Sequence, residues 1–98
     1  MNIKLNEARK IAYKKKLIKN DEDLQISTRK NKRFMILYNN KWVHFGYWPF
    51  SNLGTFLDHG DKQIKKNWKA RHSKIMKEGK EAFKNKSSPE YYSWRILW

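Results

Sequence analysis

The stretch FMILYNNKWVHFGYW, residues 34–48, is the clearest indication of the fold because two apolar runs flank a pair of asparagines. Asparagine tolerates the positive φ angle of tight turns, so the pair predicts a β-hairpin with Asn39 and Asn40 as its loop. That loop sets the register of the two strands. The expected cross-strand pairs are Leu37 with Trp42, Ile36 with Val43, Met35 with His44 and Phe34 with Phe45.

Side chains alternate between the two faces of the hairpin, and both faces are apolar. The face with the smaller branched side chains is expected to be core, and it carries Ile36, Val43, Phe45 and Tyr47. The other face mixes two indoles with a histidine, and it carries Leu37, Trp42, His44 and Trp48. We therefore expect Phe45 and Tyr47 to hold the fold, while the indoles of the second face are partly available to a partner.

The aromatic residues are unevenly distributed along the 98-residue chain. Phe, Trp and Tyr make up 15% of it, and Tyr13 is the one aromatic residue before Phe34. A core needs such side chains, so we expect a basic N-terminal arm and linker over residues 1–33 and a single folded domain over residues 34–98. Within the arm, residues 6–21 can form a solvated helix, a partly disordered segment or a helix packed on the domain.

Two further elements are expected after the hairpin. Residues 55–58, TFLD, favour a third strand, and Asp61 can cap a helix that Gly79 would stop. An apolar stripe supports this helix, and its members are Ile64, Trp68, Ile75 and Met76. The fold class is therefore α+β, with a small antiparallel three-stranded sheet packed with one main helix, plus the helical or disordered arm.

The final stretch SSPEYYSWRILW, residues 87–98, is a second concentration of aromatic residues. Ser88 can cap a short helix that Pro89 begins, although a strand is equally allowed. Because Trp98 follows two more apolar residues, we expect this end of the chain to dock against the core.

Basic residues outnumber acidic residues in both parts of the chain. The 23 Lys and Arg against 9 Asp and Glu give a net charge of +14. Half of that charge lies before Phe34, where 11 basic residues face 4 acidic ones, so the charge is not confined to a tail. A charge of this size favours a polyanionic partner, and we expect nucleic acid, DNA or RNA, or an anionic surface.

The chain has no cysteine, which excludes disulfides, zinc fingers and thiol nucleophiles and fits a reducing compartment. No apolar run approaches the ~20 residues of a transmembrane helix. The first residues also lack the apolar stretch of a secretory signal. We therefore expect an intracellular protein without a transmembrane segment.

Four short motifs occur together in the second part of the chain. They are WVHFG, TFLDHGD, ARH and SPEYYSWRILW, at residues 42–46, 55–61, 70–72 and 88–98. The combination resembles a family of small basic proteins of large nucleocytoplasmic DNA viruses, in which an HFG tripeptide, a Thr-x-x-x-His-x-Asp segment, an Arg-His pair and a Ser-x-x-Leu-Leu-Trp type ending follow in this order. The resemblance covers residues 34–98 and names no activity. It implies a viral origin and a place in the virion, or in the viral factory in the host-cell cytoplasm.

A lysine-rich helix surface beside a sheet that presents tryptophan and histidine suits nucleic-acid binding. Cations neutralise backbone phosphates, and aromatic rings stack on bases with roughly 1–3 kcal/mol for each base. The strands carry no base-reading pattern of Arg and Asn, so we expect little sequence specificity, as in genome packaging. No cofactor and no small-molecule ligand is predicted. The expected contact residues are Lys62, Lys65, Lys66, Lys69, Arg71 and Lys74 on the helix, and Trp42, His44 and Trp48 on the sheet.

Two other functions fit the same residues. A structural protein of the virion capsid or core would use the aromatic face to dock on other virion proteins, and salt would weaken that contact far less than DNA binding. A metal-dependent nuclease would need ligands, which His44, His59, Asp61 and His72 could supply. In a ββα-metal nuclease, however, a strand separates the general-base histidine from the metal-binding helix, and here the helix begins two residues after His59. We therefore predict no catalytic residue, no metal site and no enzyme.

Overall fold

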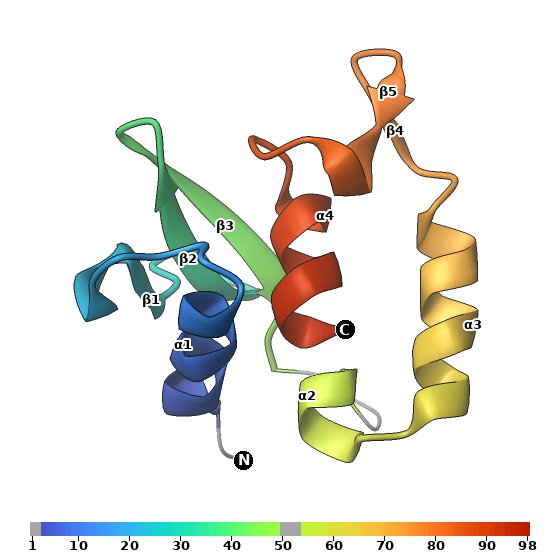
Figure 1. Ribbon diagram of the computed structural model, residues 1–98, viewed down its shortest axis with the longest axis horizontal. Coiled ribbons are helices and arrows are strands. Elements are labelled where there is room, and N and C mark those ends of the chain that lie inside the picture. Colours follow the sequence, from blue (N-terminus) through green and yellow to red (C-terminus); the bar gives the residue numbers. More distant parts are fainter. Residues whose placement is uncertain (1–2, 50–53) are drawn as a thin grey trace.

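The computed structural model describes residues 3–49 and 54–98 (Figure 1). The predicted small α+β fold with a three-stranded antiparallel sheet is confirmed, and a second, two-stranded sheet joins β4 to β5. η1 and η2 are 3-10 turns, and η3 continues α4 as a turn of π-helix. The elements are α1 (Leu5–Lys14), η1 (Asp21–Asp23), β1 (Leu24–Ile26), β2 (Lys32–Tyr38), β3 (Lys41–Tyr47), α2 (Phe56–His59), α3 (Lys62–His72), β4 (Met76–Lys77), β5 (Lys80–Glu81), η2 (Ala82–Lys84), α4 (Pro89–Tyr92) and η3 (Ser93–Leu97).

The hairpin of β2 and β3 has the register that the asparagine loop predicts. Leu37 pairs with Trp42, and the other three expected pairs are present as well. Asn39 and Asn40 have φ angles of 52° and 62°. A two-residue turn with both angles positive matches the right-handed twist of the flanking strands, so a local signal was sufficient to define this part of the sheet.

The third strand of the sheet comes from before the hairpin and not from after it. β1 runs antiparallel to β2 and pairs Leu24 with Ile36 and Ile26 with Phe34. Leu24 is fully buried, so this short strand brings a large apolar side chain to the core. The prediction of a strand over residues 55–58 is wrong, because the chain forms the helical turn α2 there.

A capping box at the first turn of α2 explains this difference. The backbone N–H and the hydroxyl of Thr55 both donate to Asp58 Oδ2 at 2.8 Å. Gly60 ends the turn with a φ angle of 69°, in the left-handed region that glycine adopts without a steric penalty. A carboxylate that serves the start of a helix in this way favours the helical turn over an extended strand.

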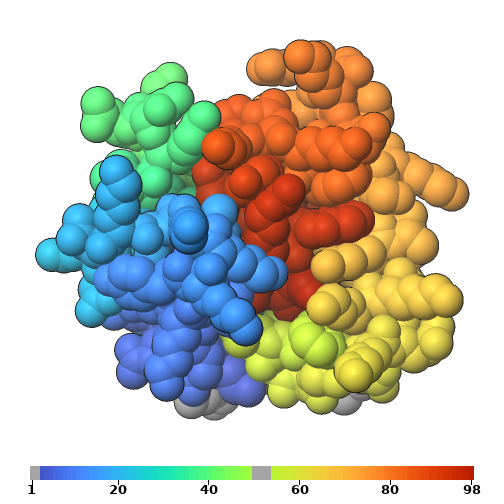
Figure 2. Space-filling view, in the orientation of Figure 1, coloured from blue at the N-terminus to red at the C-terminus, as the bar shows by residue number. Residues whose placement is uncertain are grey.

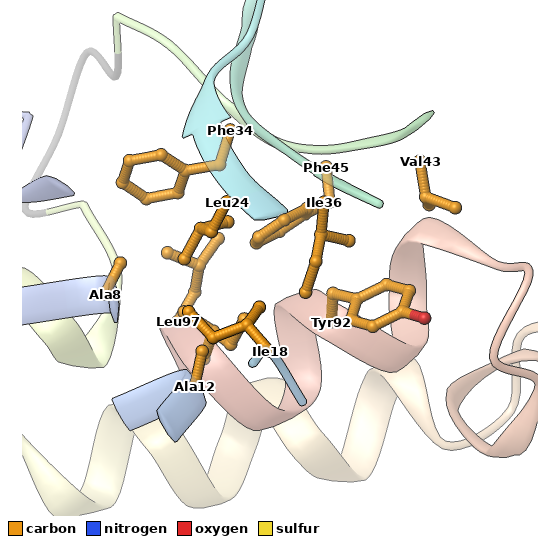
Figure 3. Close-up of a cluster of buried hydrophobic side chains, with 11 residues drawn as sticks. Ala8, Ala12, Ile18, Leu24, Phe34, Ile36, Val43, Phe45, Tyr92 and Leu97 are labelled. Atoms are coloured by element: carbon orange, nitrogen blue, oxygen red, sulfur yellow. The ribbon is translucent and has the colours of Figure 1, made fainter. Parts of the chain in front are cut away.

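One core lies between the three-stranded sheet and the helices that face it (Figure 1). Phe34 and Phe45 on the sheet meet Tyr92 and Leu97 from α4 and η3, as Figure 3 shows. The ring centroid of Phe45 lies 5.8 Å from those of Phe34 and of Tyr92. The final segment is thus docked as expected, and Ile96 and Leu97 are each only 2% exposed.

The N-terminal segment is built into the same core. Ala8 and Ala12 on α1 are completely buried, and such small side chains allow the helix backbone to pack closely. Ile18 and Leu24 belong to the same cluster of buried residues. Residues 3–33, which belong to the expected arm and linker, therefore supply α1, η1, β1 and the first two residues of β2.

Arg33 is the largest fully buried side chain among the described residues. Its guanidinium donates two hydrogen bonds of 2.8 Å to the Asp58 carboxylate and two more to the carbonyl oxygen of Ile3. The guanidinium carbon also lies 5.2 Å and 5.1 Å from the ring centroids of Phe34 and Trp48. Arginine is almost never fully buried unless it is paired, and here the pairing joins β2 to α2 and to the start of the described chain.

α3 is shorter than the pattern of apolar residues predicts. Asp61 caps it as expected by accepting from two backbone N–H groups of the first turn, but the helix ends at His72. Glu78 and Gly79 have φ angles of 54° and 78°, which closes a tight turn between β4 and β5 and takes residues 76–81 out of the helix. Neither α3 nor any other helix in residues 3–49 and 54–98 is long and apolar enough to span a membrane.

Stacked aromatic rings attach α3 to the C-terminal segment. Trp68, the buried residue of α3, stacks on Trp98 with a centroid distance of 4.8 Å and on His72 at 3.9 Å. Trp94 lies 5.9 Å from Trp68 and stacks on Phe83 at 4.1 Å. Aromatic pairs of this kind add to the free energy of burial, so these rings fix the position of α3 beside η3.

The prediction that Tyr47 belongs to the core is wrong, because its side chain is 61% exposed. Gly46, between Phe45 and Tyr47, has a φ angle of 80°, which interrupts the alternation of faces along β3. A Cβ atom at Gly46 would also lie 2.9 Å from Leu97 Cδ1 and 3.0 Å from Arg33 Cβ. Only glycine fits this close approach, and beyond it the strand turns Tyr47 outward.

Phe45→Ala should lower the free energy of unfolding by about 3–5 kcal/mol, because the lost ring leaves a cavity in the core. Tyr47→Ala, two residues away on the same strand, should cost less than about 1 kcal/mol because the ring is mostly exposed. Urea unfolding of both variants and wild type provides the measurement. Equal losses for the two variants would contradict the assignment of Phe45 to the core and Tyr47 to the surface.

Asp58→Asn should lower the free energy of unfolding by about 3–5 kcal/mol at neutral pH, because buried Arg33 loses its counter-charge. Burial by itself would raise the pKa of Asp58, but hydrogen bonds from Arg33 and Thr55 outweigh burial and hold the pKa below its ordinary value of 3.8. The stabilisation is therefore complete above the unfolded-state pKa and is lost as the pH falls through the lower folded-state pKa.

The matched control for this prediction is Asp61→Asn. Asparagine caps helices as well as aspartate does, so this variant should stay close to wild type in stability. Denaturation measured from pH 7 down to about pH 2 should show the gap between wild type and Asp58→Asn closing in acid. A gap that does not change with pH would show that the Asp58 charge is not the source of the stabilisation.

Candidate nucleic-acid interface

Two hollows lie along β3, and both are lined by Pro89 at the start of α4. The first, which we call the hairpin hollow, has a volume of about 350 Å³ and is lined by Arg29, Lys41, Trp42 and His44 among others. In Figure 2, the green tip of the β2–β3 hairpin and the orange segment before α4, which both line this hollow, are separated by a notch. The hairpin hollow therefore combines cations with three aromatic side chains, those of Tyr38, Trp42 and His44.

Trp42 and His44 present different chemistry in the hairpin hollow. Trp42 is 41% exposed, so much of its indole is open to stacking. His44 Nδ1 lies 2.7 Å from Ser27 Oγ, which holds the ring in one orientation. Burial lowers the pKa of His44, and the nearby cations Arg29 and Lys32 lower it further. An anion bound in this hollow would raise the pKa of His44 and so oppose the effect of the two cations, because a negative charge favours the protonated imidazole.

The second hollow, which we call the helix cleft, lies between the end of β3, α3 and the C-terminal segment. Its volume is about 620 Å³. Lys32 and Arg71 are exposed and bring positive charge to this cleft. Tyr47 adds an exposed ring, and the indoles of Trp68 and Trp98 form part of the apolar lining. Volumes of this size are typical of ligand-binding clefts, and cations beside aromatic rings suit phosphates and bases.

One carboxylate, that of Glu90, lines the helix cleft. Its Oε1 lies 2.9 Å from His72 Nδ1, and the His72 ring stacks on Trp68. Glu90 Oε2 is buried and has no hydrogen-bond partner in the part of the chain that the structure describes. This oxygen is therefore an acceptor that an N–H group of a ligand could use.

The six cations singled out on the predicted helix do not form one surface. Successive residues of an α-helix are rotated by about 100°, so residues two positions apart point to nearly opposite sides. Arg71 accordingly faces the helix cleft, while Lys69 points to the other side of α3. There Lys69 Nζ lies 5.2 Å from the ring centroid of Trp94, and Lys65 Nζ lies 4.4 Å from that of Phe56. The remaining cations of the set are exposed outside both hollows and are Lys62, Lys66 and Lys74.

The three sheet residues of the predicted set also separate. Trp42 and His44 lie together in the hairpin hollow. Trp48 follows β3, is partly buried, and has its ring against the guanidinium of Arg33. The structure therefore brings Trp42, His44 and Arg71 to the hollows along β3 and places Trp48 beside the buried ion pair.

Four exposed cationic or aromatic residues that line these hollows were not among the predicted contact residues. Arg29 and Lys32 fall in the expected linker, Lys41 had no assigned role, and Tyr47 was expected to be core. A signal was available, because Lys32 and Lys41 begin the two strands that flank the asparagine turn. A cation at a strand end beside an exposed ring is a usable indication of a nucleic-acid surface.

The histidines lie apart from one another. His59 Nδ1 accepts from the backbone N–H of Asp61 at 2.8 Å, and its ring centroid lies 5.5 Å from that of Trp98. Within residues 3–49 and 54–98, no group of three His, Asp or Glu side chains could hold a metal ion. The candidate metal ligands His44, His59, Asp61 and His72 are therefore not assembled into one site.

Residues 22–72 match a family that is described as a family of unknown function, DUF5754. The matched stretch begins within the expected linker and includes β1, β2, β3, α2 and α3. No curated protein and no solved structure matches the chain. Because the matched residues make up more than half of the 98-residue sequence, the chain belongs to the DUF5754 family.

Proposed function

We propose that the protein binds nucleic acid, DNA or RNA, along β3, mainly through phosphate contacts and with little sequence specificity. The observation that carries this proposal is the charge of the two hollows. Among their described lining residues, one carboxylate is present, that of Glu90, and it already lies against His72. The cations that line them are Arg29, Lys32, Lys41 and Arg71.

Exposed rings support binding of single strands in particular. Trp42 is 41% exposed in the hairpin hollow, and Tyr47 is 61% exposed in the helix cleft. A ring can stack on a base only when that base is not already enclosed in a duplex. Exposed rings on β3 with cations beside them in both hollows therefore favour a single strand that follows β3.

The proposed lack of sequence specificity follows from the burial of the arginine in the described strands. Bidentate arginine is the commonest reader of a guanine edge. In the described strands the one arginine, Arg33, is fully buried and bonded to Asp58. The remaining cations along β3 belong to strand ends and to neighbouring elements, where they suit phosphate contacts better than base reading.

A docking role on other virion proteins stays a second prediction, as does the viral origin that the resemblance implies. The exposed apolar side chains beside the β4–β5 turn favour it, since Ile75 and Met76 are 41% and 57% exposed. Salt distinguishes the two functions. Phosphate-driven binding should weaken steeply between about 50 and 200 mM salt, whereas an apolar protein contact should persist.

Replacing Arg29, Lys41 and Arg71 together with glutamine should weaken binding of a single-stranded oligonucleotide, because three phosphate contacts are lost. The slope of log affinity against log salt concentration should become shallower by about 2, at about 0.7 for each contact to a single strand. Fluorescence anisotropy of a labelled oligonucleotide, titrated at several salt concentrations, measures both the affinity and the slope.

The matched control replaces Lys62, Lys66 and Lys74 with glutamine. This variant loses the same charge from exposed positions that line neither hollow. We expect it to keep most of the affinity and nearly all of the salt slope. Equal losses in the two triple variants would mean that binding follows net charge alone and that the surface along β3 is not the interface.

Trp42→Ala should weaken oligonucleotide binding by about 1–3 kcal/mol through the loss of one stacked base, with little loss of stability. Trp42→Phe is the matched variant, because it keeps a ring for stacking but removes the indole as a fluorescent reporter. We expect quenching of indole emission on binding in wild type and a clearly smaller quench in Trp42→Phe at similar affinity. Unchanged affinity of Trp42→Ala would exclude stacking in the hairpin hollow.

A further inference from the structure

Four cationic side chains from three separate segments gather on another part of the surface. We call them the cationic cluster, and they are Lys15 after α1, Lys65 and Lys69 on α3, and Arg95 in η3. Figure 2 shows side chains from the blue N-terminal, yellow α3 and red C-terminal segments meeting near the centre of the visible face. None of the four lines either hollow along β3.

Arg95 is held in place by contacts that leave part of its guanidinium unused. Its carbon Cζ lies 3.6 Å from the ring centroid of Tyr91. Its Nη1 donates to the carbonyl oxygens of Phe83 at 2.6 Å and Tyr91 at 3.1 Å. No hydrogen bond to a described residue occupies Nη2 or Nε, so the N–H groups of these two atoms remain available to an oxyanion.

The three lysines of the cationic cluster are also supported. Lys69 Nζ lies 5.2 Å from the Trp94 ring centroid, and Lys65 Nζ lies 4.4 Å from that of Phe56. Lys15 Nζ donates to the carbonyl oxygen of Arg95, which ties the end of α1 to η3. An ammonium has three donors, so each lysine can still donate to a bound anion.

The cationic cluster has no counter-charge within the described residues. Their ion pairs are Arg33 with Asp58, His72 with Glu90 and Lys84 with Glu81, and none involves the cluster. Burial lowers the pKa of Lys15, and Lys65, Arg95 and Lys14 lower it further. Burial also lowers the pKa of Lys69, and the positive charges of Lys65, Lys15 and Arg95 lower it further. Like charges that are partly desolvated together repel one another, and a bound anion would relieve that repulsion.

We propose that the cationic cluster is a binding site for linked phosphates, a diphosphate or triphosphate group held between α1, α3 and η3. A single phosphate carries about two negative charges at neutral pH, which is too few for four cations, whereas a chain of phosphates can match them. Arginine suits such a group because its planar fork contacts two oxygens, and lysines add point charges around it. The phosphates can belong to a free polyphosphate or nucleotide, or to a nucleic-acid chain.

The test is a titration of the full-length protein with sodium tripolyphosphate at about 150 mM salt. Isothermal titration calorimetry measures the binding. Wild type should bind one tripolyphosphate per chain. The double variant Lys15→Gln, Lys69→Gln should bind about tenfold more weakly or worse, because two charge-assisted contacts are lost. The control, Lys62→Gln with Lys66→Gln, removes the same charge from exposed positions on α3 and should bind like wild type.

Two results would overturn the proposal. One is the absence of saturable one-to-one binding to wild type, and the other is an equal loss of affinity in the double variant and its control. Circular dichroism checks that the variants are folded. If the double variant does not fold, Lys15→Gln alone, at an exposed position, repeats the test and should still weaken binding more than Lys62→Gln.

A second titration identifies the source of the phosphates. An oligonucleotide that displaces tripolyphosphate from wild type shows that the cationic cluster takes phosphates of a nucleic-acid chain. If ATP displaces tripolyphosphate and the oligonucleotide does not, the ligand is a free nucleotide or polyphosphate. This proposal does not rest on the surface along β3. The variant that replaces Arg29, Lys41 and Arg71 should therefore bind tripolyphosphate like wild type, even if it no longer binds the oligonucleotide.

Discussion

The buried ion pair between Arg33 and Asp58 is the interaction on which the arrangement of the other elements depends. A guanidinium can leave water only where oxygen atoms replace its lost hydration, and here a carboxylate and a backbone carbonyl do so. The same carboxylate accepts from Thr55 and so holds the start of α2. The sheet, the first described residues and the turn that leads into α3 are therefore joined at one point, with Gly46 packed against the Arg33 stem.

The large positive charge of the chain is organised by aromatic rings more than by carboxylates. Three ion pairs are formed within the described residues, and one of them uses a histidine. Lys65, Lys69 and Arg95 instead lie against the rings of Phe56, Trp94 and Tyr91. A ring orients a cation without neutralising it, so the charge remains available to an outside anion. This property underlies the cationic cluster, to which Lys65, Lys69 and Arg95 belong.

The candidate site could be predicted in part, and the successes and failures have different physical causes. Trp42 and His44 were found because alternation along a hairpin is a local property. Arg29 was missed because it lies in a stretch without any period and reaches the hairpin hollow through the pairing of β1 with β2. The cations of α3 were predicted as one set because helical spacing defines relative angles, but only the docking of Trp68 determines which side of the helix faces a cleft.

Local signals in the chain are sufficient to define the hairpin and its register, the cap of α3, the burial of the final residues and the strongly basic character. These follow from turn angles, capping side chains, alternation and composition, which act over a few residues or need no geometry at all. Long-range packing, in contrast, makes β1 the third strand, turns Tyr47 outward and brings Lys15 to Lys65, Lys69 and Arg95. Contacts such as Arg33 with Asp58 join residues far apart in the chain, and such pairs leave no periodic signal in the sequence.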